Sequence, residues 1–137
     1  MKTFNCKYCN KENKTKKNTY NLFCDNKCQG LFRFHTETVP KIESGLNNCD
    51  TRTLKKYLIY KHGNKCSCCK IGNVWNEKEL SLHLDHIDGN SDNNDVSNIR
   101  LLCPNCHSQT DTYSGKSSKI VKQTRRNKYL RKYKGYS

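Results

Sequence analysis

The chain has 137 residues, of which only 33% are apolar, and its 26 Lys and Arg outnumber 12 Asp and Glu to give a formal net charge of +14. This length suits one domain or two very small ones. No stretch approaches the run of about 18 apolar residues that a membrane span needs, which excludes a transmembrane protein. The positive charge favours a polyanionic partner, most simply a nucleic acid. Because the first residues form no hydrophobic segment, we expect no secretory signal and a cytoplasmic location.

Ten Cys residues compensate for the small core. In a reducing compartment, clustered Cys pairs indicate metal sites, whereas a disulfide framework is typical of secreted proteins. The pairs form two sets, and each set could close a tetrahedral zinc site with four thiolates. The ligands predicted for two structural Zn²⁺ ions are Cys6, Cys9, Cys24 and Cys28 in the first site, and Cys66, Cys69, Cys103 and Cys106 in the second. Cys68 could compete with Cys69, which we prefer for its two-residue spacing from Cys66.

Residues 1–40 are predicted to form a small basic module around the first zinc site. Its polar segment, residues 11–18, predicts a loop, and the run after Cys28 predicts a short helix. The few residues expected in its core are Phe23, Leu31, Phe32 and Phe34.

Residues 41–63 are predicted to be a linker followed by an amphipathic helix over residues 50–63. Asp50 or Thr51 can cap the start of this helix, and Gly63 is suited to the position after its end. Three apolar side chains share one face at helical spacing, namely Leu54, Tyr57 and Leu58.

Residues 64–113 carry 4 basic and 7 acidic side chains, which makes them the acidic segment of a basic protein. Acidic groups close to a polyanion need a reason, and a bound divalent cation is the obvious one. Alternating apolar residues from Leu80 to Leu84 predict a strand, and residues 99–102 predict the strand that returns beside it. Pro104 suits the first position of a helix that follows Cys103.

Residues 114–137 hold 9 basic side chains and no acidic one. Such a tail is predicted to contact DNA phosphates, which contributes affinity rather than base reading. The candidate DNA-contacting residues are Lys116, Lys119, Lys122, Arg125, Arg126, Lys128, Arg131 and Lys132.

Three residues of the acidic segment together suit phosphodiester hydrolysis, which needs a base, a cation and precise positioning. His86 can be the base, since imidazole titrates near neutral pH. Asp85 offers a hard oxygen ligand suited to Mg²⁺ or Mn²⁺. His107 directly follows a zinc-binding Cys pair that would fix its backbone, so it can be a second ligand of the same cation.

These residues resemble the signature of the HNH endonucleases, a family with a ββα-metal fold, in the form found in bacteriophages and mobile introns. The likeness extends from Trp75 through residues 80–90 and 98–110. It implies a small zinc-stabilised α+β protein in which a ββα-metal nuclease core, residues 64–113, follows the N-terminal zinc module.

The resemblance also implies a role for each matching residue. His86 would be the general base, and Asn98 would hold the loop and orient that base, so both count as catalytic. Asp85 and His107 would ligate the catalytic Mg²⁺ or Mn²⁺, and Asp85 keeps a metal ligand where many members have His. The implied partner is double-stranded DNA, cut to 5′-phosphate and 3′-hydroxyl ends, and the implied setting is the host cytoplasm if a phage encodes the protein.

Three other classes stay open at this point. A zinc-dependent DNA-binding protein that kept the fold without cutting would show no magnesium-dependent nicking. An RNA-binding zinc protein would prefer RNA, and a redox protein would exchange thiols rapidly. Within the nuclease interpretation, His83 lies on the same predicted strand face as Asp85 and could touch the phosphate. The sequence does not indicate any protein partner.

Overall fold

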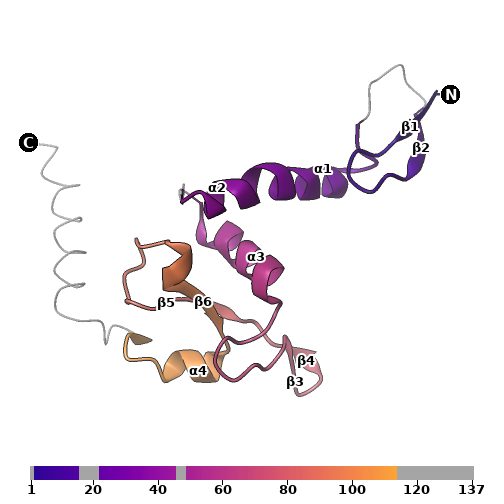
Figure 1. Ribbon diagram of the computed structural model, residues 1–137. Coiled ribbons are helices and arrows are strands. Elements are labelled where there is room, and N and C mark those ends of the chain that lie inside the picture. The colour runs from indigo at the N-terminus through magenta and orange to yellow at the C-terminus, as the bar shows by residue number, and fades with distance from the viewer. Residues whose placement is uncertain (1, 16–21, 46–48, 114–137) are drawn as a thin grey trace, which may run out of the picture. The chain divides into compact units, whose positions relative to one another are not determined.

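The computed structural model describes residues 2–15, 22–45 and 49–113 (Figure 1). Its helices and short strands form a small α+β structure, as predicted, in two compact units, Met1–Leu46 and Asn47–Ser137. The basic tail and its candidate DNA contacts lie outside the described residues, so their role stays a prediction. Across the described ranges, no helix combines the length and the apolar character that a bilayer crossing requires.

The N-terminal unit begins with a two-stranded ribbon around the first Cys pair. Strand β1 (Lys2–Asn5) pairs antiparallel with β2 (Glu12–Thr15). The prediction of a loop over residues 11–18 is therefore wrong at β2. The four residues of β2 are polar and carry no strand signal; a tight turn closed by the Cys6 carbonyl, which accepts from the Asn10 N–H at 2.9 Å, brings them back along β1.

A continuous helical segment follows the second Cys pair of this unit. Helix α1 (Asn26–Arg33) begins at Asp25, whose carboxylate accepts the Cys28 N–H at 2.7 Å. It continues through a π-helical turn, η1 (Phe34–Thr38), into α2 (Val39–Glu43). The predicted helix after Cys28 is confirmed but longer than expected, and it occupies the first residues of the predicted linker.

Pro40 did not end the helix because it lies in the first turn of α2, directly after the π-helical turn. Proline has no N–H to donate, and a π-turn already changes the backbone hydrogen-bond pattern at that point. Of the predicted core residues, Phe34 is buried, whereas the other three are only half-buried. The buried residues that the sequence analysis missed are Val39 and Ile42.

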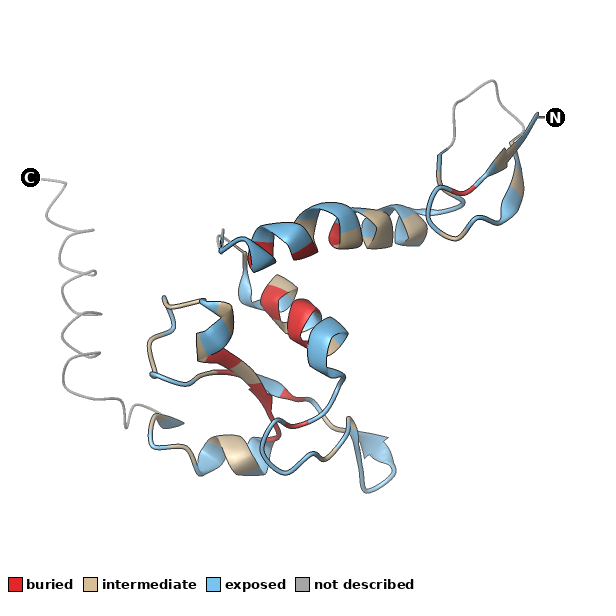
Figure 2. Cartoon of the chain, in the orientation of Figure 1, coloured by how far each residue is buried: buried red, intermediate tan, exposed pale blue. Residues whose placement is uncertain are grey.

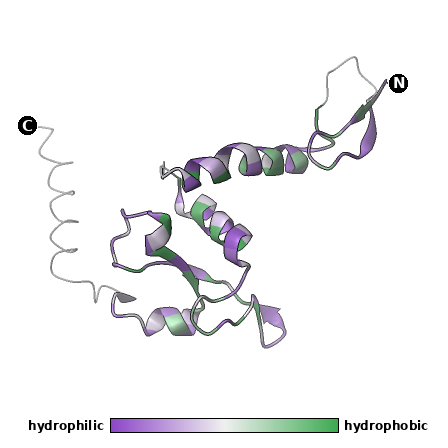
Figure 3. Cartoon of the chain, in the orientation of Figure 1, coloured by the Kyte–Doolittle hydropathy of each residue, from purple (hydrophilic) through white to green (hydrophobic). Residues whose placement is uncertain are grey.

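The second unit starts with α3 (Thr51–His62), where the predicted helix is confirmed. Asp50 is its N-cap and accepts the Thr53 N–H at 2.7 Å, and Gly63, with φ 83°, ends it. Hydrophobic and hydrophilic positions alternate around α3 (Figure 3). The predicted apolar face is buried, with Leu54, Tyr57 and Leu58 between 0% and 4% exposed.

A short hairpin of β3 (Val74–Trp75) and β4 (Lys78–Glu79) extends from this unit. Its two turn residues, Asn76 and Glu77, both have positive φ angles, of 52° and 61°. This backbone is typical of the tightest hairpin turns. Trp75 is 62% exposed, so the residue that begins the HNH-like signature lies on the surface.

A ββα unit forms the rest of the described chain. Strand β5 (His83–His86) pairs antiparallel with β6 (Ile99–Leu102), and the short 3-10 turn η2 (Val96–Asn98) directly precedes β6. Helix α4 (Pro104–Ser108) then begins directly after its N-cap, Cys103, as predicted. Helix α3 packs against β6 of the ββα unit, and both elements carry buried residues (Figure 2). The strand predicted from Leu80 begins only at His83, because the Leu80 N–H bonds to the Asn73 carbonyl instead.

Candidate active site and metal centres

The predicted grouping of eight cysteines into two sets of four is confirmed, and within each set the sulfur atoms lie within 4.8 Å of one another. In the second group, Cys66 begins a tight turn in which its carbonyl accepts the Lys70 N–H at 3.0 Å. Cys103 is the N-cap of α4, and its sulfur accepts the Cys106 N–H at 3.4 Å. Cys69 belongs to this group and Cys68 does not, which confirms the choice made from spacing.

The electrostatics of the second group fit a cation. Burial raises the pKa of the Cys66 thiol, but backbone hydrogen bonds, first from Cys103 and then from Cys69 and Cys68, outweigh it and lower the pKa to about 6. The neighbouring sulfurs, first that of Cys103, raise the pKa of Cys106 well above its usual value. One thiolate therefore forms readily, and further negative charge needs a cation between the sulfurs. Four sulfurs at this spacing fit Zn²⁺.

The first group repeats this pattern in the N-terminal unit. Despite burial, hydrogen bonds from the backbone of Cys9, Cys24 and Tyr8 lower the pKa of Cys6 to about 6. The Cys24 sulfur lies 3.2 Å from that of Cys28 and is the main reason why the pKa of Cys28 is raised. Each unit thus holds its own candidate zinc site.

The ββα unit brings Asp85 and His107 together. Asp85 lies in β5 and is only 4% exposed, while His107 follows Cys106 in α4. The Asp85 Oδ1 and the His107 Nε2 are 3.7 Å apart. Because α4 starts after Cys103 of the second Cys group, an ion bound there would fix the distance of His107 from the sheet.

A divalent cation fits between these two atoms. The 3.7 Å separation is too long for a direct hydrogen bond. Two ligand atoms that each lie about 2.0–2.4 Å from one ion are roughly 2.8–4 Å apart. The carboxylate oxygen suits Mg²⁺ or Mn²⁺, and Mg²⁺ keeps several waters, so few protein ligands suffice. Asp85 and His107 would therefore hold the ion.

Arg100 is a residue that the sequence analysis missed. It lies directly opposite Asp85 in the β5–β6 register, and its Nε donates to the Asp85 Oδ2 at 2.8 Å. The second carboxylate oxygen is thereby occupied, which leaves Oδ1 facing His107. Pairing the two predicted strands in this register would have revealed the contact.

His86 is held by the loop after β5 rather than by the pair beside it. Its Nε2 lies 2.8 Å from the Asn94 Oδ1, an acceptor that no sequence signal singled out. Within the described residues, no recorded contact joins His86 to Asp85 or His107. The structure thus brings Asp85 and His107 into proximity. His86 is adjacent to Asp85 in the sequence.

Asn98 ties the two ends of the loop between β5 and β6. Its Oδ1 accepts the Asp88 N–H at 3.1 Å, and its Nδ2 donates to the Asp88 Oδ1 and the Asn93 carbonyl, both at 2.9 Å. The Asn93 side chain donates to Asp88 as well and is the main reason why the pKa of that carboxyl is lowered. Asn94, the partner of His86, directly follows Asn93, so this loop connects Asn98 with the predicted base.

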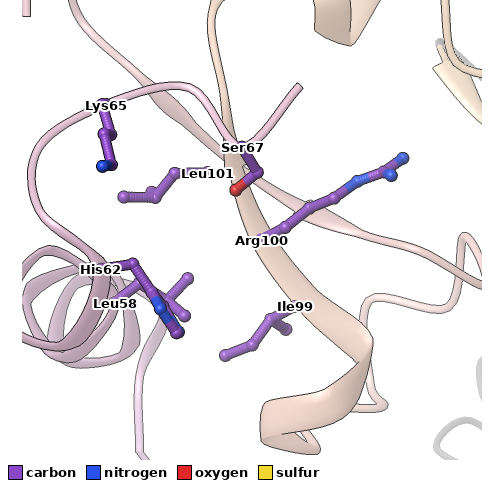
Figure 4. Close-up of a pocket in the computed structure, with 7 residues that line it drawn as sticks. All are labelled: Leu58, His62, Lys65, Ser67, Ile99, Arg100 and Leu101. Atoms are coloured by element: carbon purple, nitrogen blue, oxygen red, sulfur yellow. The ribbon is translucent and has the colours of Figure 1, made fainter. Parts of the chain in front are cut away.

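Two hollows flank β6. One of about 130 Å³ lies between the end of α3 and β6, and Figure 4 shows the Arg100 side chain directed away from it. The other, of about 430 Å³, is lined by Arg100, Leu102 and Ile87 together with the residues after α4. Arg100, the hydrogen-bond partner of Asp85, lines this larger groove, whereas Asp85 and His107 are not among its lining residues.

Comparisons with known proteins match the part of the chain that contains the second Cys group and the ββα unit. The family model described as HNH endonuclease matches residues 66–112. The H-N-H endonuclease F-TflIV of Escherichia phage T5 is 46% identical over 54 residues, which are 39% of this chain and 23% of that protein. The matched region is therefore less than a quarter of the length of this curated relative. No solved structure matches the chain.

Proposed function

We propose that this chain is a metal-dependent DNA endonuclease, because residues 66–112 match the HNH endonuclease family model and a similar segment occurs in a phage H-N-H endonuclease. The observation that carries the proposal is the approach of the Asp85 Oδ1 and the His107 Nε2 to 3.7 Å. A non-catalytic DNA-binding protein would have no use for a carboxylate and an imidazole spaced as two ligands of one ion. Magnesium and manganese both suit this pair.

The cation supplies, when bound, positive charge for the phosphate and for the departing 3′ oxygen. Asp85 and His107 would hold it. His86 takes a proton from the attacking water as the water oxygen bonds to phosphorus and the bond from phosphorus to the 3′ oxygen breaks. The departing 3′ oxygen takes a proton from solvent, which gives 5′-phosphate and 3′-hydroxyl ends.

The hydrogen bond of His86 supports its role as base. An amide oxygen only accepts, so the Asn94 Oδ1 takes a hydrogen from Nε2 of His86. The Nδ1 of a neutral His86 then carries the lone pair that can accept a proton from water.

The rest of the chain would place this site on double-stranded DNA. The ββα unit is too small to bind a long site alone, and the N-terminal zinc unit together with the basic residues of 114–137 would extend the contact. The setting we propose is that of a phage or homing-type endonuclease, acting in the host cytoplasm.

Cleavage of supercoiled plasmid tests the proposal. The wild-type protein should nick or linearise plasmid only with added Mg²⁺ or Mn²⁺. His86→Ala should cleave roughly 10²–10⁴-fold more slowly, the usual contribution of a general base, and should bind DNA unchanged. His62→Ala, in an exposed residue of α3, is the matched control and should cleave normally.

Two outcomes would count against this function. Tight DNA binding without metal-dependent cutting would favour the non-catalytic DNA-binding protein. Full activity of His86→Ala would remove His86 from the role of base while leaving the cation site to be tested separately.

A further inference from the structure

The His107 ring lies between two side chains of β5. Its Nδ1 is 3.2 Å from the Nδ1 of His83, and its Nε2 is 3.7 Å from the Oδ1 of Asp85. His83 and Asp85 are alternate residues of one strand and therefore share a face. The ring of Tyr113 also packs edge-on against His107, with centroids 5.2 Å apart, so the imidazole is held from more than one direction.

The two distances restrict where the proton between His83 and His107 can lie. A separation of 3.2 Å is within hydrogen-bond range, and 3.7 Å is not. Two lone pairs would repel at 3.2 Å, so one of the two facing nitrogens must carry a hydrogen. A neutral imidazole has only one N–H. If His107 carries it on Nδ1, the Nε2 lone pair faces Asp85 across the gap that fits a cation.

We propose that His83 is a positioning residue, whose Nδ1 accepts the Nδ1–H of His107 and so directs the Nε2 lone pair of His107 at the cation. This inference rests on the proposed function, since it requires a cation between Asp85 and His107.

A histidine that ligates a metal nearly always donates its other ring N–H to a neighbouring group, which fixes the tautomer. The nearby carboxylate of Asp85 is not available for this, because Arg100 holds its Oδ2 and its Oδ1 faces the cation gap. Among the described residues, the group in contact with the far nitrogen of His107 is the second imidazole, His83.

The tautomer can be read directly on the zinc-loaded full chain. Long-range ¹H–¹⁵N spectra distinguish a protonated ring nitrogen from one with a lone pair. With Mg²⁺ added, His107 should show Nδ1–H and an unprotonated Nε2. Two results would overturn the proposal. If the spectra show that the Nδ1 atoms of both His83 and His107 bind the metal, His83 is a ligand. If they show a hydrogen on Nε2 of His107, His83 does not direct that nitrogen at the cation.

Cation affinity supplies a second readout that does not depend on cleavage. In His83→Leu, Mn²⁺ binding followed by electron paramagnetic resonance should weaken about 10–100-fold, the usual effect of losing such a partner. His83→Gln offers an oxygen acceptor and should recover most of the affinity. His62→Leu makes the same change at an exposed histidine of α3 and should bind Mn²⁺ normally. Zinc content and circular dichroism verify that each variant is folded.

Asp85→Asn separates this inference from the proposed function. If Asp85→Asn binds Mn²⁺ as the wild type does, the cation site itself is misplaced and both proposals fail. If Asp85→Asn loses Mn²⁺ while folded His83→Leu keeps it, the cation site stands and only the role of His83 is refuted. If His83→Leu and His83→Gln bind Mn²⁺ equally weakly, the role of His83 is also refuted, because a hydrogen-bond acceptor at this position would then make no difference.

Discussion

The charge of Asp85 is balanced within the protein before any cation arrives. Its side chain is 5% exposed, and its partner Arg100 is 35% exposed, so one end of the pair is buried and the other reaches solvent. A buried carboxylate is costly unless it is paired. Arg100 therefore stabilises the fold without the proposed catalytic cation and also leaves Oδ1 of Asp85 to face His107.

Removing the Arg100 side chain should destabilise the zinc-loaded protein more without Mg²⁺ than with it. Arg100→Met keeps much of the side-chain packing but leaves the buried carboxylate without a counter-charge. We expect a loss of about 1–3 kcal/mol in the free energy of unfolding, below the value for a fully buried pair because Arg100 is partly exposed. Urea unfolding of the zinc-loaded protein, followed by circular dichroism, measures it.

Added Mg²⁺ should reduce this loss, because an ion that binds only the folded state stabilises it. Arg100→Met in an Asp85→Asn background should cost much less than in the wild type, since no charge is left unpaired. A similar loss in both backgrounds would show that Arg100 acts through packing alone.

The sequence indicated which residue types could carry the chemistry of the site. It did not indicate the contacts made by three further residues, Arg100, His83 and Asn94. Asp85, His86 and His107 stood out because their residue types and order suit one reaction. Arg100 and His83 gain their roles from strand register and from the position of α4. Asn94 depends on the path of an irregular loop, which no periodic pattern specifies.

At the scale of elements, the loop between β5 and β6 owes its order to side-chain amides rather than to secondary structure. Asn98 makes three side-chain hydrogen bonds across it, and Asp88 is the shared partner of Asn93 and Asn98. The loop is exposed and polar, so apolar packing cannot hold it. Its shape, and with it the position of His86, should depend on this network.

Asn98→Ala removes all three of these hydrogen bonds and should loosen the loop without unfolding the protein. Hydrogen exchange at the Asp88 amide, which loses its acceptor, should speed up. Single-turnover cleavage should slow by up to about 10²-fold, the cost of displacing a catalytic group by around 1 Å. Asn64→Ala, at an exposed asparagine before the second Cys cluster, is the control and should change neither quantity. Fast exchange with unchanged cleavage would show that the network does not position His86.

Elements with local signals were predictable, and elements without them were not. The start and end of α3 follow from Asp50 and Gly63, and α4 follows from Pro104 after Cys103. In contrast, β2 is a polar strand formed by the return of the chain after a Cys turn. The helical segment that passes Pro40 depends on a π-turn, for which the sequence offers no marker.

At the scale of the whole molecule, two compact units each carry one group of four cysteines. Apolar residues are scarce, and few side chains in either unit are fully buried. Cores of this size rarely provide enough stability alone, and structural zinc supplies folding free energy where they do not. We therefore expect the stability of each unit to depend on its own metal ion.

Single Cys→Ser variants test this independence. Cys66→Ser should lose one of two zinc ions, unfold the second unit and abolish cleavage, because α4 and His107 depend on that site. Cys6→Ser should also lose one zinc ion, but it should retain cleavage at saturating DNA while binding DNA more weakly. Cys68→Ser is the matched control beside the second cluster and should keep both ions. Zinc content by mass spectrometry and folding by circular dichroism report each outcome. Loss of both ions in Cys6→Ser would show that the two units fold together, and loss of an ion in Cys68→Ser would overturn the ligand assignment.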